Sequence, residues 1–127
     1  MRFDRLILGV DFDGTVVDHR YPKVGPDVPH AVESLLALTS LGTKLVLNTM
    51  RGTETIKPAT QWFSDRKIPL FGIWEEPLQH TWTDSPKCYA HLYVDDAAIG
   101  CPLIQVDGFH QKCVDWLEVM KMLKEVR

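Results

Sequence analysis

Apolar and polar positions form blocks along the chain that predict strands and helices in turn. Continuous apolar runs, typical of strands covered on both faces, occur at residues 6–10, 44–50, 71–74, 91–94 and 103–106. Apolar residues spaced three and four apart predict helices over residues 27–41, 54–67 and 110–127. This alternation favours a single α/β domain over residues 1–127, with a parallel sheet and helices on both of its faces.

Composition and charge exclude several classes of protein. The chain is 45% hydrophobic and 24% charged with a net charge of −3, which is typical of a globular domain and disfavours a basic nucleic-acid module. Its apolar runs are far shorter than the roughly 20 residues of a membrane span, and its first residues lack a signal-peptide pattern. We therefore expect a cytoplasmic protein. Its three cysteines, without a C-x-x-C pair, are expected to be reduced and buried.

Two acidic pairs follow buried strands. Asp11 and Asp13 come after the first apolar run, and Asp95 and Asp96 come directly after the fourth. In open α/β sheets, ligands bind outside the carboxyl ends of the strands, so these carboxylates are expected to converge at one edge. Like charges this close need a cation, and oxygen ligands favour Mg²⁺. The sequence therefore predicts a Mg²⁺ site at this edge.

Mg²⁺ recruits phosphate oxygens to complete its coordination shell, which points to phosphoryl chemistry. Asp11 is the candidate nucleophile, and Asp13 is the candidate general acid and then base. Thr49, at the end of the second predicted strand, offers a hydroxyl to a phosphoryl oxygen. Lys87, eight residues before Asp95, offers a positive charge. These side chains supply the groups that phosphoryl transfer requires.

Four motifs in this order resemble those of the haloacid dehalogenase-like (HAD) superfamily. They are DFDGTV at residues 11–16, LNT at residues 47–49, Lys87, and YVDD at residues 93–96. The resemblance implies the roles given above for Asp11, Asp13, Thr49 and Lys87. It also implies metal ligation by Asp11, Asp13, Asp95 and Asp96, with Asp13 contributing its backbone carbonyl. Gly14, Thr15 and Asn48 belong to the same motifs and are the expected substrate-binding residues.

The resemblance also implies a fold. This is a Rossmann-like three-layer α/β/α sandwich whose mainly parallel five-stranded sheet has the order 3-2-1-4-5. The gaps between the motifs are short, so the chain resembles the small members of the family that lack a cap domain. Residues 17–24 occupy the place of the family's flap. We expect Arg20 in this segment, and Arg51 after the second strand, to contact the substrate.

Each motif alone has an ordinary structural explanation. Asp13-Gly14 is a common turn dipeptide, and Lys87 is also typical of a solvated surface charge. An EF-hand is excluded, because counting from Asp11 puts Val16 where the loop requires glycine. The histidines lack the spacing of a zinc site. The order of the four motifs, three of them at strand ends, therefore favours a phosphoryl-transfer site.

The function expected from these residues is Mg²⁺-dependent hydrolysis of a phosphomonoester through an aspartyl-phosphate on Asp11. The substrate is expected to be a small phosphorylated metabolite, sugar or nucleotide, because the acidic charge disfavours long nucleic acids. The resemblance implies an open site that either a neighbouring subunit of a homo-oligomer or the substrate itself would cover. One alternative is a phosphatase with a macromolecular substrate. Others are a phosphorylatable or Mg²⁺- and phosphate-binding signalling module without turnover, as in receiver domains, and an inactive descendant that binds a partner.

Overall fold

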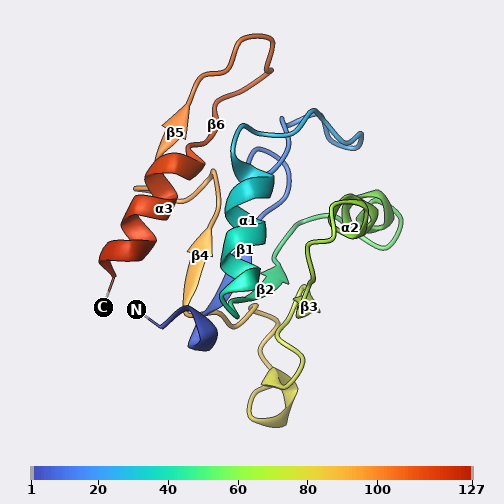
Figure 1. The fold of residues 1–127 in the computed structure, drawn as a ribbon. Helices are drawn as coiled ribbons and strands as arrows, with labels where there is room; N and C mark the ends of the chain where they lie inside the picture. The colour runs from blue at the N-terminus through green and yellow to red at the C-terminus, as the bar shows by residue number, and fades with distance from the viewer. Residues whose placement is uncertain (1, 127) are drawn as a thin grey trace.

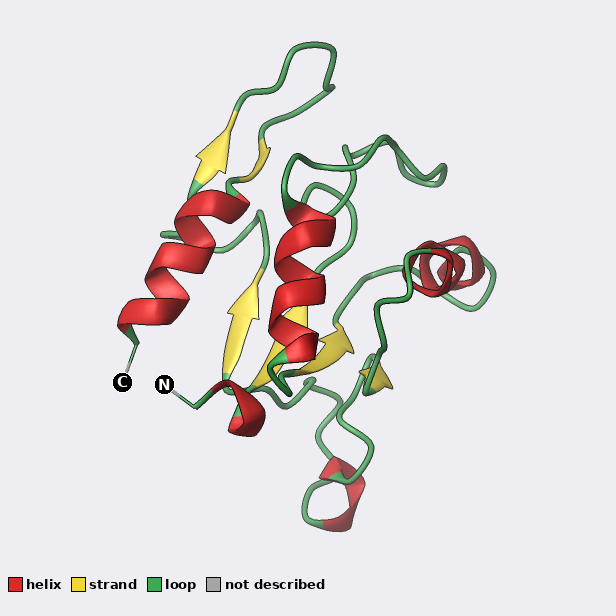
Figure 2. Cartoon of the chain, in the orientation of Figure 1, coloured by secondary structure: helices red, strands yellow, loops and turns green. Residues whose placement is uncertain are grey.

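The structure, a computed structural model, describes residues 2–126. A parallel sheet contains β1 (Ile7–Val10), β2 (Lys44–Leu47), β3 (Gly72–Ile73) and β4 (Leu92–Val94) in the order β3-β2-β1-β4. A separate antiparallel pair contains β5 (Leu103–Ile104) and β6 (Cys113–Val114). The helices are α1 (Ala31–Ser40), α2 (Ile56–Asp65) and α3 (Trp116–Glu125), with short 3₁₀ turns η1 (Phe3–Arg5) and η2 (Gln79–Thr81) (Figures 1 and 2). No helix in this part of the chain is long and apolar enough to cross a membrane.

The predicted α/β class is confirmed, but the sheet differs from the one expected. Among the described residues the parallel sheet has four strands, so the five-stranded sheet of order 3-2-1-4-5 is not found. The fifth predicted strand, β5, pairs instead with β6, where Ile104 is opposite Cys113. The backbone N–H of Val114 donates to the carbonyl of Gly14, which anchors this hairpin beside the loop after β1.

One face of the sheet carries the core. Leu8 lies opposite Leu45, and Val10 lies opposite Leu47, so these four side chains leave on the same face. All four are buried in one apolar cluster that also contains residues from α1, α2 and α3. Helices α1 and α3 lie next to each other over this face (Figure 1). The three helices thus contribute to a single core.

The opposite face of the sheet is covered by an irregular segment, residues 75–91, rather than by a layer of helices. A Cβ at Gly9 would lie 2.8 Å from the Tyr93 ring and 3.4 Å from the Cβ of Ala90, so the segment approaches the sheet closely. The buried Gln79 side chain holds the segment in place. It donates to the Lys87 carbonyl at 2.8 Å and accepts from the Tyr89 N–H at 2.9 Å. The expected second layer of helices, on this face of the sheet, is therefore not found in the described residues. An irregular segment fixed by side-chain hydrogen bonds covers the face instead.

All three helices begin later than the apolar spacing predicts, α2 by two residues at Ile56. Helix α1 begins at Ala31 instead of residue 27, because the backbone before it pairs with the loop after β1: Asp27 forms an antiparallel bridge with Val17, and the Val28 N–H donates to the Val16 carbonyl at 2.9 Å. Helix α3 begins at Trp116 instead of residue 110, because residues 113–114 form β6. The Asp115 side chain accepts from the Glu118 N–H and caps α3. The sequence contains this signal, because an acidic residue three positions before a glutamate is typical of a helix start. The prediction from apolar spacing alone did not use it.

The cysteines are free thiols. Cys88 and Cys113 are buried and Cys101 is half-buried, so the expected burial is found for two of the three. Burial raises the pKa of the Cys113 thiol to about 11, and the nearby carboxylate of Asp18 acts in the same direction. These thiols are therefore packing residues and poor nucleophiles at neutral pH.

Candidate active site

Three carboxylates gather where β1 and β4 end. Asp11 follows β1, and Asp95 and Asp96 follow β4; the two strands are parallel neighbours. The backbone N–H of Asp11 donates to the carbonyl of Val94 at 3.0 Å, which extends the pairing to the site. Carboxylate oxygens of the three aspartates lie within 4.8 Å of one another. The parallel register therefore brings together acids that are more than 80 residues apart in sequence.

Thr15 joins the two acidic segments. Its hydroxyl donates to Oδ2 of Asp11 at 2.9 Å and accepts from the backbone N–H of Asp96 at 3.2 Å. Thr15 is fully buried, and its carbonyl accepts from the indole N–H of Trp116 at 2.7 Å. The turn after β1 is thus fixed both to the acidic segment after β4 and to the start of α3.

Gly14 makes room for the carboxylates. Its φ of +85° lies in the left-handed region, and a Cβ at this position would overlap the Asp96 carboxylate, with its Cγ at 2.7 Å. A side chain at position 14 would therefore push Asp96 out of the cluster. The structure assigns Gly14 a steric role beside the acids.

The carboxylate cluster carries more negative charge than its surroundings neutralise. Burial raises the pKa of Asp11 from 3.8 to about 8, and the charge of Asp95 and a hydrogen bond with Asp96 act in the same direction. Burial also raises the pKa of Asp96, and the charge of Asp95 adds to this effect. The cluster therefore holds a proton near neutral pH. A cation bound by its oxygens would displace that proton, and an all-oxygen donor set fits a hard divalent cation.

The Asp13 carboxylate is not part of this cluster. It forms a bidentate ion pair with Arg51, in which Nε donates to Oδ2 at 2.9 Å and a terminal nitrogen donates to Oδ1 at 2.7 Å. Asp13 therefore faces the same pocket as Asp11 but is held by a cation from the loop after β2. This pairing involves only the Asp13 side chain and does not occupy the backbone carbonyl, the atom through which the resemblance implies metal ligation.

The acids line a pocket of about 560 Å³. Thr49 also lines it, and its hydroxyl accepts from the backbone N–H of Arg51 at 3.2 Å, which leaves the hydroxyl proton available to a ligand. Asn48 is half-buried one residue earlier, and its backbone N–H donates to the Val10 carbonyl. The predicted Arg51 lines it as well, and the remaining walls come from His19, Tyr21, Met50, Ala97 and Gln111.

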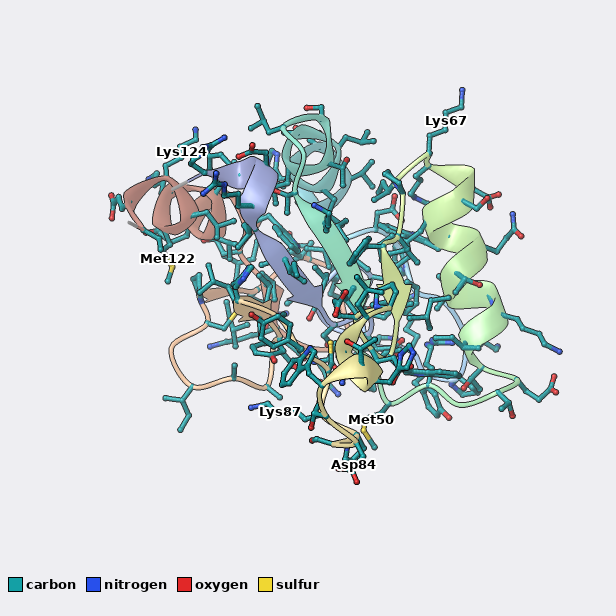
Figure 3. All side chains as sticks on the ribbon, turned by 90° about the horizontal axis from the view of Figure 1, so that it is seen from below. Met50, Lys67, Asp84, Lys87, Met122 and Lys124 are labelled. Atoms are coloured by element: carbon teal, nitrogen blue, oxygen red, sulfur yellow. The ribbon has the colours of Figure 1, made fainter. Side chains whose placement is uncertain are left out.

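Five predicted site residues do not line this pocket: Gly14, Thr15, Arg20, Asn48 and Lys87. Lys87 lines a second pocket of about 360 Å³, on the irregular segment, with Trp82. Its ammonium lies 5.7 Å from the centre of the Tyr93 ring. Arg20 pairs with Asp18 at 2.9 Å and donates to the Gly108 carbonyl at 3.0 Å. Figure 3 labels Lys87 together with Asp84 from the same segment and Met50 from the main pocket.

Gln111 and Asp18 were missed in the sequence. The fully buried Asp18 carboxylate accepts from the backbone N–H of His110, which holds the loop between β5 and β6 over the flap, residues 17–24. This places Gln111 in the pocket wall. The flap and this loop extend beyond the tip of the β4 arrow in Figure 1. The sequence signal for the contact between Asp18 and His110 is an acidic residue directly after two apolar ones, Val16 and Val17.

Comparison with known proteins gives one informative match. No protein-family model matches the chain, and no curated protein matches it. A solved structure of a conserved protein from Bacteroides thetaiotaomicron is similar to the chain, with 31% sequence identity and a TM-score of 0.79. The similarity covers 94% of this chain and 90% of that protein. The chain therefore belongs to the same family as this conserved Bacteroides thetaiotaomicron protein.

Proposed function

We propose that the protein is a Mg²⁺-dependent phosphomonoester hydrolase of the HAD superfamily that works through an aspartyl-phosphate on Asp11. The observation that carries the proposal is the convergence of Asp11, Asp95 and Asp96 at the ends of β1 and β4, with Thr49 in the same pocket. The proton that this cluster holds without metal is further support, because it marks unbalanced charge that a bound cation would relieve. Three of the four sequence motifs contribute residues to this pocket, namely those of Asp11, Thr49 and Asp95.

In this proposal, an oxygen of Asp11 attacks phosphorus while the bond from phosphorus to the leaving oxygen breaks. For this step Asp13 must enter in its protonated form: it takes a proton from solvent when substrate binds and gives it to the leaving oxygen as the bond breaks. The resulting carboxylate then takes a proton from the water that attacks the phosphoenzyme, which releases phosphate, regenerates the Asp11 carboxylate and leaves Asp13 protonated for the next turnover. The Thr49 hydroxyl donates to a phosphoryl oxygen. Asp11, Asp95 and Asp96 would hold Mg²⁺, which would supply neutralising charge for the phosphoryl group.

We propose Lys87 as the second source of positive charge. Its ammonium lies over the ring of Tyr93, on the strand that leads to Asp95, and it forms none of the ion pairs found in residues 2–126. An exposed cation–π contact is worth only about 0.5–1 kcal/mol, so a bound phosphoryl group outweighs it. A long flexible side chain can then turn towards the anion.

A small substrate fits the pocket best. Its volume of about 560 Å³ lies within the range of small-molecule sites, and the flap and the β5–β6 loop stand beside it. We therefore propose a phosphorylated metabolite, sugar or nucleotide as the substrate class. The position of Lys87 outside the pocket favours a second candidate, a module that binds Mg²⁺ and phosphate without turnover.

The test is phosphate release from 4-nitrophenyl phosphate and from a panel of sugar and nucleotide monophosphates, with and without Mg²⁺. Wild type is compared with Asp11→Asn and with Asp84→Asn, a matched change at an exposed acid of the irregular segment. Mg²⁺-dependent turnover that Asp11→Asn abolishes and Asp84→Asn retains supports the hydrolase. Mg²⁺-dependent binding of phosphate without turnover of any ester would support the binding module instead.

A further inference from the structure

Arg51 uses every hydrogen-bond donor that it has. Its guanidinium carries five N–H groups, of which two bind the Asp13 carboxylate. The other three donate to the backbone carbonyls of Pro22 at 3.1 Å, Lys23 at 3.0 Å and Thr55 at 2.9 Å. In this arrangement no N–H of Arg51 remains for a phosphoryl oxygen.

Arg51 is one of the residues that line the pocket, but its guanidinium is packed rather than free. The residue is only 1% exposed, and its guanidinium lies 4.9 Å from the centre of the Phe12 ring and 5.2 Å from that of the Tyr21 ring. Its charge is balanced by a carboxylate that is itself nearly buried. A buried arginine with an ion partner and aromatic neighbours is typical of a structural clamp.

We propose that Arg51 is the positioning residue for the proton-transfer carboxyl of Asp13, and that it does not bind the substrate phosphate. This inference rests on the proposed hydrolase function. One guanidinium joins the carboxylate to two carbonyls of the flap and to the carbonyl that precedes α2. It therefore sets where Asp13 stands relative to the leaving group whenever the flap is in place.

The lone pairs of Asp13 allow this role. Each of its oxygens accepts one N–H from Arg51, and a carboxylate oxygen has two acceptor sites, so one site on each oxygen remains. The planar fork fixes the plane of the carboxylate and hence the direction of the remaining sites. A lysine ammonium offers a point charge without this planar geometry, so Arg51→Lys keeps the charge but releases the orientation.

A general acid accelerates loss of the leaving group most when that group is a poor one, which must be protonated as it departs. We therefore compare kcat/KM for 4-nitrophenyl phosphate, whose leaving group departs without protonation, with kcat/KM for an alkyl phosphate, whose leaving group needs a proton. Since kcat/KM reports steps up to loss of the leaving group, later hydrolysis of the phosphoenzyme does not enter. Both esters are measured on one preparation, so the ratio of the two values is independent of the folded fraction.

For Arg51→Lys we expect a loss of about 100-fold in kcat/KM for the alkyl ester and less than about tenfold for the nitrophenyl ester. Asp13→Asn should change the ratio in the same direction. In the double variant, Arg51→Lys should add nothing to the ratio of Asp13→Asn, because it acts through that carboxylate. Arg66→Lys is the matched control: it alters another bidentate arginine, which pairs with Asp27, and should leave the ratio unchanged.

Equal losses for the two esters in Arg51→Lys would overturn the inference, since they would mean a general structural role or direct binding of phosphate. Additive effects of Arg51→Lys and Asp13→Asn on the ratio would also overturn it. A wild-type protein that cleaves neither ester would instead overturn the proposed hydrolase, and the inference with it. The two failures are therefore distinguishable.

Discussion

The backbone N–H of His110 lies 2.9 Å and 3.1 Å from the two carboxylate oxygens of Asp18, 92 residues earlier in the chain. Burial alone would raise the pKa of Asp18, but the N–H groups of His110 and Gln111 and the guanidinium of Arg20 outweigh burial and hold the pKa below its ordinary value. One buried charge therefore holds the β5–β6 loop against the flap and sets the position of that side of the pocket.

Asp18→Asn should lower the free energy of unfolding by about 1–3 kcal/mol, because it removes the charge and directs an NH₂ group at other donors. The measurement is urea denaturation at pH 7, with Asp107→Asn as the control at an exposed acid of the same loop. The pKa of Asp18 is lowered in the folded state, so its contribution is present above about pH 4 and lost as the pH falls through the lowered value. A difference that persisted below this range would contradict the explanation by charge.

The metal-free protein should lose stability as the pH rises from about 4 to about 8. Because the pKa of Asp11 is raised to about 8, the folded state binds more protons than the unfolded state in this window. Unfolding in EDTA should therefore show wild type losing stability relative to Asp11→Asn as the pH increases. Mg²⁺ at ten times its Kd should restore about 1.4 kcal/mol to wild type at pH 8. An equal effect of Mg²⁺ on Asp11→Asn would place the metal elsewhere.

Gly14→Ala should abolish Mg²⁺ binding, because its Cβ would overlap the Asp96 carboxylate. The matched control is Gly100→Ala, which has nearly the same positive φ, +89°, but nothing within 4 Å of the added carbon. Both variants should lose about 1–2 kcal/mol from backbone strain. Only Gly14→Ala should lose the stabilisation by Mg²⁺ in thermal unfolding, and equal Mg²⁺ responses would refute the steric role of Gly14.

Lys87→Met should lower kcat/KM for a phosphomonoester by about 100-fold while changing the free energy of unfolding by less than about 1 kcal/mol. The small effect on stability is expected because Lys87 is exposed. Lys124→Met on α3 is the control, and Figure 3 shows both lysines. Unchanged activity of Lys87→Met would contradict the proposal that this lysine contacts the phosphoryl group.

The sequence predicted the strands of the parallel sheet well, because a strand buried on both faces requires an apolar run. It also predicted which acids end β1 and β4, and the register places Asp11 with Asp95 and Asp96 as the pattern indicated. Local signals determined these features. They also predicted a strand at β5, but not its partner, because β5 pairs with β6 through a contact that apolar spacing does not encode.

The orientation of the site residues was decided by tertiary structure. Asp11 and Asp13 share one motif, yet one carboxylate joins a cluster and the other pairs with Arg51, because a guanidinium from the loop after β2 reaches only Asp13. Likewise, Asp18 and His110 meet only after folding. The chain by itself determined which residue types lie at the strand ends. Which of their atoms face the pocket depends on partners distant in sequence, because a buried charge must be paired by whatever donor the fold brings to it.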